Sequence, residues 1–219
     1  GQGVRRAAEQ LGQKTDAYAL HVKGLELPGW APRGTPGMGL AYMTADRGAC
    51  HQRGFMVAYE VGGKPYRGRA VEAAGISGKA EILIGEQNYS AGTDTLVKCD
   101  FGSFGIPPGR YGELLQAATG RKLDAGFFER VGERIWNRIR LYNLREGLTA
   151  EQDRLPARIV DELLPGGPQK GSRIRRTDVQ RMRAEYYALR GWDDRGEPGQ
   201  RKLQELKLDN EPRFDCRPG

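Results

Sequence analysis

A carboxylate and a thiol lie five residues apart in the segment Asp94-Thr95-Leu96-Val97-Lys98-Cys99-Asp100-Phe101. A carboxylate accepts hydrogen bonds, and a thiolate is both a nucleophile and a metal ligand. Asp94 and Cys99 could therefore form one half of a cofactor site. The alternative from the residues alone is a surface carboxylate near a buried cysteine, and both interpretations stay open.

The second group of reactive side chains is the polar segment Asp46-Arg47-Gly48-Ala49-Cys50-His51-Gln52-Arg53-Gly54. His51, one of two histidines in the chain, lies here among an aspartate, a thiol and two arginines. Arginine pairs suit anionic oxygens, because the planar guanidinium binds phosphate in a bidentate manner. The segment predicts contact with an anionic ligand, and its alternative is a structural histidine among surface salt bridges.

Several familiar chemistries are not indicated by the sequence. Cys50 and His51 are adjacent, so their side chains diverge and a catalytic dyad is not expected. The chain contains no Walker loop, no GxGxxG after a strand and no HExxH zinc pattern. Residue types alone therefore predict polar clusters in a scaffold, and no specific reaction.

The net charge of +7 raises the question of nucleic-acid binding. The densest basic run, from Lys170 to Arg183, contains no interleaved aromatic residues and is interrupted by Asp178. We interpret it as a solvated helix face and expect no nucleic-acid partner. Three widely spaced cysteines without a CxxC pair indicate a reducing, cytoplasmic setting. No apolar run approaches the ~20 residues of a membrane span.

The elements around these groups are predicted to be helices. Apolar residues recur at three- and four-residue steps between glycines, prolines and capping residues. Asp124 and Thr177 are expected N-caps, and Gly191 is expected to end a helix. The expected helices cover residues 2–11, 39–45, 77–101, 108–120, 124–147, 155–164, 177–189 and 200–206. No pair of alternating strands is evident, so the predicted fold class is all-α and multihelical.

The connections are expected to be irregular and rich in glycine and proline. Residues 24–39 hold Pro28, Pro32 and Pro36 together with five glycines, but also apolar residues such as Trp30. Such a composition excludes a regular element, and the apolar residues favour an ordered wrap over a core. The stretch 39–45 is small and apolar, which predicts a buried helix.

Several motifs together resemble the tungsten-dependent aldehyde ferredoxin oxidoreductases. They occur in the expected order across nearly the whole chain, and the first and last are the most specific. The matching segments are Val22-Lys23-Gly24-Leu25-Glu26-Leu27-Pro28, Gly37-Met38-Gly39-Leu40-Ala41-Tyr42, Asp46-Arg47-Gly48-Ala49-Cys50-His51, Asn143-Leu144-Arg145-Glu146-Gly147, Asp153-Arg154-Leu155-Pro156-Ala157-Arg158 and Tyr186-Tyr187-Ala188-Leu189-Arg190-Gly191-Trp192-Asp193.

The resemblance implies that the chain is the C-terminal, helical part of a longer enzyme. Such enzymes oxidise aldehydes to carboxylic acids with water and pass two electrons through a [4Fe–4S] cluster to ferredoxin. Their tungsten or molybdenum is bound by the dithiolenes of two molybdopterin-type cofactors. We expect residues 1–22 to end a preceding helical domain, 23–208 to form the cofactor-contacting domain and 209–219 to be a tail.

The resemblance also assigns roles around the first segment. Cys99 matches the fourth cluster ligand, and Asp94 matches an aspartate that binds pterin nitrogens. The family pattern Asp-x-x-Gly-Leu-Cys is broken here, because Val97 replaces the glycine and Lys98 the leucine. Lys98 and Asp100 are assigned to the same cofactor-binding set, and Lys98 is expected to add positive charge beside the cluster.

In the second segment, His51 matches a histidine near the metal that could bind the substrate oxygen or move a proton. Asp46, Arg47 and Arg53 fall where pterin and phosphate contacts cluster. Within the same family, a benzoyl-CoA-reductase-like subunit is the alternative enzyme, and a non-catalytic helical module is the alternative of a different class. Expected partners are ferredoxin or another electron-transfer subunit, and a homo-oligomer is also expected.

Overall fold

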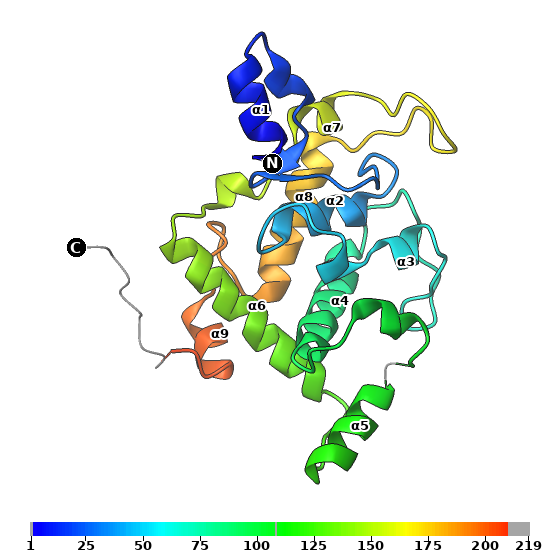
Figure 1. Ribbon diagram of the computed structural model, residues 1–219, viewed down its shortest axis with the longest axis vertical. Helices are drawn as coiled ribbons and strands as arrows, with labels where there is room; N and C mark the ends of the chain where they lie inside the picture. Colours follow the sequence, from blue (N-terminus) through cyan, green and yellow to red (C-terminus); the bar gives the residue numbers. More distant parts are fainter. Residues whose placement is uncertain (1, 108, 210–219) are drawn as a thin grey trace, which may run out of the picture.

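The computed structural model describes residues 2–107 and 109–209 and consists of packed helices with one small hairpin (Figure 1). This confirms the predicted all-α class, and no described helix is long and apolar enough to cross a membrane. The predicted start of a helix at Pro108 and nearly all of the predicted tail, including Cys216, fall outside the described residues. The helices are α1 (Gly3–Leu11), α2 (Pro36–Thr44), α3 (Val57–Glu60), α4 (Lys79–Asp94), α5 (Gly109–Thr119), α6 (Phe127–Arg145), α7 (Ala157–Asp161), α8 (Arg176–Arg190) and α9 (Gln200–Glu205).

Helix α2 lies at the centre of the fold, and all of its residues are buried, as the small, apolar sequence predicts. At its N-terminus the backbone N–H groups of Gly37 and Met38 donate to the Glu60 carboxylate at 2.7 and 3.0 Å. At its C-terminus the Lys23 ammonium donates to backbone carbonyls. An anion at the positive end and a cation at the negative end both stabilise the helix dipole.

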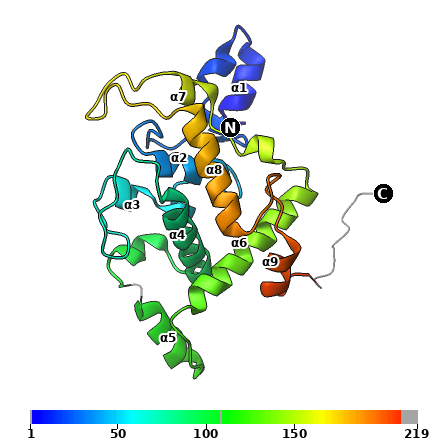
Figure 2. The same cartoon turned by 180° about the vertical axis from the view of Figure 1, so that it is seen from behind.

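Helices α4 and α6 cross in direct backbone contact, and Figure 2 shows both beside α8. A Cβ at Gly132 would lie 1.7 Å from the Asn88 carbonyl oxygen, and one at Gly92 would lie 2.1 Å from that of Phe128. Only glycine permits this approach. The Trp136 indole then donates to the Gln87 carbonyl at 2.8 Å. The C-terminal half of α4, which ends at Asp94, is thereby fixed on α6.

A buried arginine joins α8 to α4. Arg190 has no exposed surface, and its guanidinium donates to Gln87 Oε1 at 2.8 Å, to Asn88 Oδ1 at 2.6 Å and to the Tyr186 hydroxyl at 3.1 Å. A buried charge requires such hydrogen bonds. The last turn of α8 is therefore held against α4 by polar side chains within the core.

The structure also contains a hairpin that the sequence did not predict. Strands β1 (His21–Val22) and β2 (Leu25–Glu26) pair antiparallel through a turn at Lys23 and Gly24. These turn residues have φ values of +53° and +87°, which is typical of tight hairpin turns. With two residues each, the strands are too short to show an alternating pattern.

The boundaries of several helices differ from the predictions. Asp124 does not cap α6; it accepts a hydrogen bond from Gly126 N at 3.1 Å, and the helix begins at Phe127. Thr177 lies inside α8, where Asp178 instead accepts from the N–H of Arg175 at 3.2 Å. In both cases the helix begins two residues away from the position that the expected N-cap implied, with Gly126 and Arg175 as the N-cap residues. The helix expected over 155–164 is shortened to α7, while Gly191 ends α8 in the predicted left-handed conformation.

Candidate cofactor site

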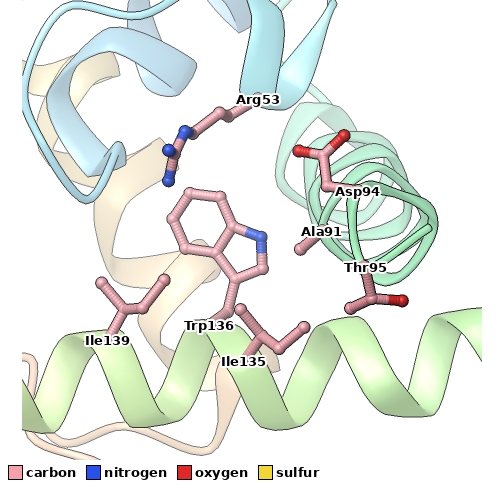
Figure 3. A pocket seen from close by; sticks show the side chains of 7 residues that line it. All are labelled: Arg53, Ala91, Asp94, Thr95, Ile135, Trp136 and Ile139. Atoms are coloured by element: carbon pink, nitrogen blue, oxygen red, sulfur yellow. The ribbon is translucent and has the colours of Figure 1, made fainter. Parts of the chain in front are cut away.

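A cavity of about 260 Å³ lies between the C-terminal end of α4, the middle of α6 and the short 3-10 helix η2 (Gln52–Gly54). Figure 3 shows Arg53 and Asp94 on two sides of the Trp136 indole, above α6. The cavity therefore combines an apolar wall with one cationic and one anionic side chain. Its lining residues are Arg53, Ala91, Asp94, Thr95, Ile135, Trp136 and Ile139.

Asp46 orients Arg53 at the edge of this cavity. Helix α2 ends where Ala45 becomes extended, and the Asp46 side chain that follows is 9% exposed. Its Oδ2 accepts a hydrogen bond from Arg53 Nη1. Its Oδ1 is buried and has no hydrogen-bond partner among the residues that the structure describes. Asp46 does not itself line the cavity, so its contribution there is the orientation of Arg53.

The position of Arg53 follows from the packing of η2 on α4. Gly54 is buried, and a Cβ at this position would lie 2.5 Å from Leu83 Cδ1. The neighbouring Arg53 is therefore held at the surface of α4, with its side chain 39% exposed. Its guanidinium is available both to Asp46 and to the cavity.

Asp94 is the last residue of α4 and faces the same cavity. Burial raises the pKa of this carboxyl, and the negative charge of Asp100 raises it further, while Lys98 and Arg53 act in the opposite direction. The structure thus brings Asp94, Asp100, Lys98 and Arg53 into one electrostatic environment. The sequence had assigned these four residues to the cofactor set from separate segments.

The chain leaves the helical conformation after Asp94, so the helix predicted over 77–101 is too long. Thr95 Oγ1 donates back to the Gly92 carbonyl at 2.6 Å, and Val97 has a left-handed φ of +56°. Such a backbone cannot continue an α-helix. Cys99 therefore lies in an extended and exposed position before the 3-10 helix η3 (Asp100–Phe104).

Lys98 folds back onto the residues that follow it. Its ammonium lies 2.7 Å from Asp100 Oδ1 and 3.0 Å from Ser103 Oγ, and it lies 5.2 Å from the centre of the Tyr111 ring. The side chain is 13% exposed. The positive charge of Lys98 is therefore matched locally by Asp100, and the Cys99 thiol remains accessible.

The other predicted site residues do not line the cavity. His51 is half-buried, and its ring centre lies 6.3 Å from that of Phe55. Arg47 is exposed and donates to the Sγ of buried Cys50 at 3.2 Å. Both lie on the segment that leads to Arg53, but neither contacts the cavity.

The sequence analysis did not identify Ile135 and Ile139 as part of a ligand site. Ile135 and Ile139 belong to the apolar stripe that predicts α6, yet both are only half-buried. The face of α6 that enters the core carries Asn137 and Arg140 as well as Phe128, Gly132 and Trp136. The isoleucines of α6 alternate with Asn137 and Arg140 in the sequence. This mixture was the one sign that polar residues of α6 could be buried while its isoleucines remain half-exposed.

Within the described residues, no three His, Cys, Asp or Glu side chains converge on a possible metal position.

Comparison with known proteins defines the family. The sequence matches aldehyde ferredoxin oxidoreductase, domains 2 and 3, over residues 1–208, and the chain belongs to this family. The tungsten-containing aldehyde ferredoxin oxidoreductases of Pyrococcus furiosus and Thermococcus kodakarensis are each 39% identical to it over 208 and 209 residues. These alignments cover 94% of this chain and 33% of each relative, so the chain spans one third of their length.

A solved structure shares the fold. It is the active site complex BamBC of benzoyl coenzyme A reductase with 1,5-dienoyl-CoA, and one of its chains matches with a TM-score of 0.66 and 18% identity. The match covers 94% of this chain and 35% of that chain. At this identity the likeness concerns the fold alone.

Proposed function

We propose that this chain is the C-terminal part of a tungsten or molybdenum pterin oxidoreductase that oxidises aldehydes to carboxylic acids. Electrons would leave through a [4Fe–4S] cluster to ferredoxin or another electron-transfer subunit. Family membership and the activity for which the relatives are named support this proposal. The observation that carries it is the end of α4, where Asp94 faces the cavity and Cys99 is exposed five residues later.

The residues of the cavity fit part of a pterin cofactor. Asp94 is an acceptor suited to pterin N–H groups, and Arg53, which Asp46 orients, is a donor suited to anionic oxygens. Ile135 and Trp136 exclude water from one side. When bound, the metal pterin would supply the two-electron oxidation of the aldehyde. The exposed Cys99 thiolate is of the type that ligates iron–sulfur clusters.

In this proposal His51 moves a proton. Its imidazole makes no side-chain hydrogen bond within the described part of the chain, so a ring nitrogen is available to a substrate oxygen. Oxidation of an aldehyde with water releases two protons along with two electrons. A histidine is suited to accept one of them, because its ordinary pKa lies near neutral pH.

The test uses the full-length protein that carries this chain, with metal content, cluster spectra and aldehyde-dependent viologen reduction measured together. Asp94→Asn is expected to lower pterin and tungsten content, and Cys99→Ser to remove the intact cluster signal. His51→Asn is expected to keep both while turnover falls roughly 100-fold or more. Asp161→Asn is the control, because Asp161 pairs with Arg176 on the surface.

An intact cluster in Cys99→Ser, or near-normal turnover in His51→Asn, would contradict the assigned roles. The fold shared with the benzoyl coenzyme A reductase complex motivates one more assay. Reduction of an aromatic CoA thioester without aldehyde oxidation would favour the reductase-like alternative. A full-length protein that binds neither metal nor cluster would favour a non-catalytic module.

A further inference from the structure

Lys23 is buried at the C-terminal end of α2 and is not among the candidate site residues described above. Its side chain is 6% exposed, and its ammonium donates to the carbonyl oxygens of Met43 at 2.7 Å and Ala45 at 2.8 Å. Asp153 Oδ1 lies 2.6 Å from the same nitrogen. The two carbonyls accept hydrogen bonds from the ammonium, and the Asp153 carboxylate forms an ion pair with it. Lys23 therefore fixes the last carbonyl groups of α2 immediately before Asp46.

Asp153 connects Lys23 to the opposite side of the core. Its side chain is fully buried, its Oδ2 lies 2.9 Å from Arg140 Nη1, and it accepts from the Tyr187 hydroxyl. Burial lowers the pKa of Lys23, whereas the carboxylates of Asp153 and Asp46 oppose this shift. We call Lys23, Asp153, Arg140 and Tyr187 the buried ion cluster. It joins residues from the hairpin, the segment before α7, α6 and α8.

The segment 45–51, called here the site loop, is held by two further contacts. Asn143 Nδ2 on α6 donates to the Asp46 carbonyl at 2.7 Å. Gly48 has a φ of +112°, and a Cβ there would lie 2.3 Å from the Val22 carbonyl oxygen. The loop is thus fixed between the hairpin and α6. Neither Lys23 nor Asn143 lines the cavity.

We propose that Lys23 is a positioning residue: it fixes the end of α2 so that the site loop holds Asp46 where it orients Arg53 toward the cavity. His51 at the end of the same loop would be positioned by the same contact. An effect of Lys23 on catalysis rests on the proposed function, whereas its effect on the position of the site loop does not. A purely structural lysine would stabilise the fold without a specific effect on the loop.

The chain offers a matched control at the other end of α2. Lys79 is 1% exposed, and its ammonium lies 2.7 Å from the fully buried Glu60. Lys23→Met and Lys79→Met each remove a buried charge from an ion pair, so both are expected to lower the melting temperature. Hydrogen–deuterium exchange of the full-length protein is then measured on peptides covering residues 45–54. Lys23→Met is expected to accelerate exchange there roughly tenfold, because two charge-assisted hydrogen bonds are lost, while Lys79→Met does not.

Asp153→Asn provides a second variant of nearly unchanged shape, and it is expected to accelerate exchange in the same peptides to a smaller extent. Equal exchange of residues 45–54 in Lys23→Met and Lys79→Met would overturn the proposal. If Lys23→Met does not fold, unchanged exchange in Asp153→Asn would overturn it equally. On the proposed function, kcat per bound tungsten is expected to fall for Lys23→Met. If the wild type does not oxidise aldehydes but Lys23→Met still exchanges faster than Lys79→Met over residues 45–54, the proposed function is rejected and the positioning role of Lys23 is supported.

Discussion

Replacement of Val97 by glycine is expected to stabilise the protein. Val97 has a φ of +56°, and its side chain is 94% exposed. A left-handed backbone costs a residue other than glycine roughly 1–2 kcal/mol, and a β-branched side chain makes it especially unfavourable. Almost no apolar burial is lost on removing an exposed side chain. Glycine is also the residue that the family pattern has at this position.

The expected size follows from two opposing effects. Removing the strain gains about 1–2 kcal/mol, and the greater freedom of glycine in the unfolded chain costs about 0.5–1 kcal/mol. The net gain is about 0.5–1 kcal/mol, which corresponds to an increase of roughly 1–4 °C in melting temperature for a chain of this size. Urea denaturation followed by far-UV circular dichroism, together with a thermal scan, measures both quantities.

Val61→Gly is the matched control for this prediction. Val61 is 58% exposed but has an ordinary φ of −115°, so glycine there relieves no strain. This variant is expected to lose about 0.5–1 kcal/mol of stability. The two variants should therefore differ in sign. If Val97→Gly destabilises the protein as much as Val61→Gly does, the proposed backbone strain at Val97 is wrong.

Two further predictions concern the α4–α6 contact and the cavity. Gly132→Ala should lower the stability by about 2–3 kcal/mol, because the new Cβ would lie 1.7 Å from the Asn88 carbonyl oxygen. The control Gly166→Ala, which has no atom within 4 Å of the new Cβ, should change stability by less than about 0.5 kcal/mol. Equal melting temperatures of the two variants would contradict the close packing of α4 on α6. The pKa of Asp94 is higher in the folded state than in the unfolded chain, so protonated Asp94 favours the folded state. This contribution to stability is present at acid pH and is lost as the pH rises through the folded-state pKa. Asp94→Asn should therefore be more stable than wild type in urea at pH 7, with a smaller difference at pH 4, and a difference that grew on acidification would contradict the sign.

The sequence by itself determined the helical class and the family. Apolar periodicity located most helices, the small residues of 39–45 indicated the buried α2, and Gly191 marked the end of α8. These features are local, because they depend on residues within one or two helical turns. The same local signals failed at Asp124 and Thr177, which lie two positions from the observed N-caps, and at the turn of Lys23 and Gly24, where each strand has only two residues.

Only the tertiary structure decided which polar residues meet. Asn143 reaches the Asp46 carbonyl across 97 positions of sequence, and Lys23 pairs with Asp153 from a different part of the chain. Arg53 joins Asp94 at one cavity because glycines let α4 approach both η2 and α6. The sequence could name these side chains as candidates, but their distances depend on how helices pack against one another. Helix packing depends on side-chain volume and on buried partners, and neither is encoded in the periodicity of a single helix.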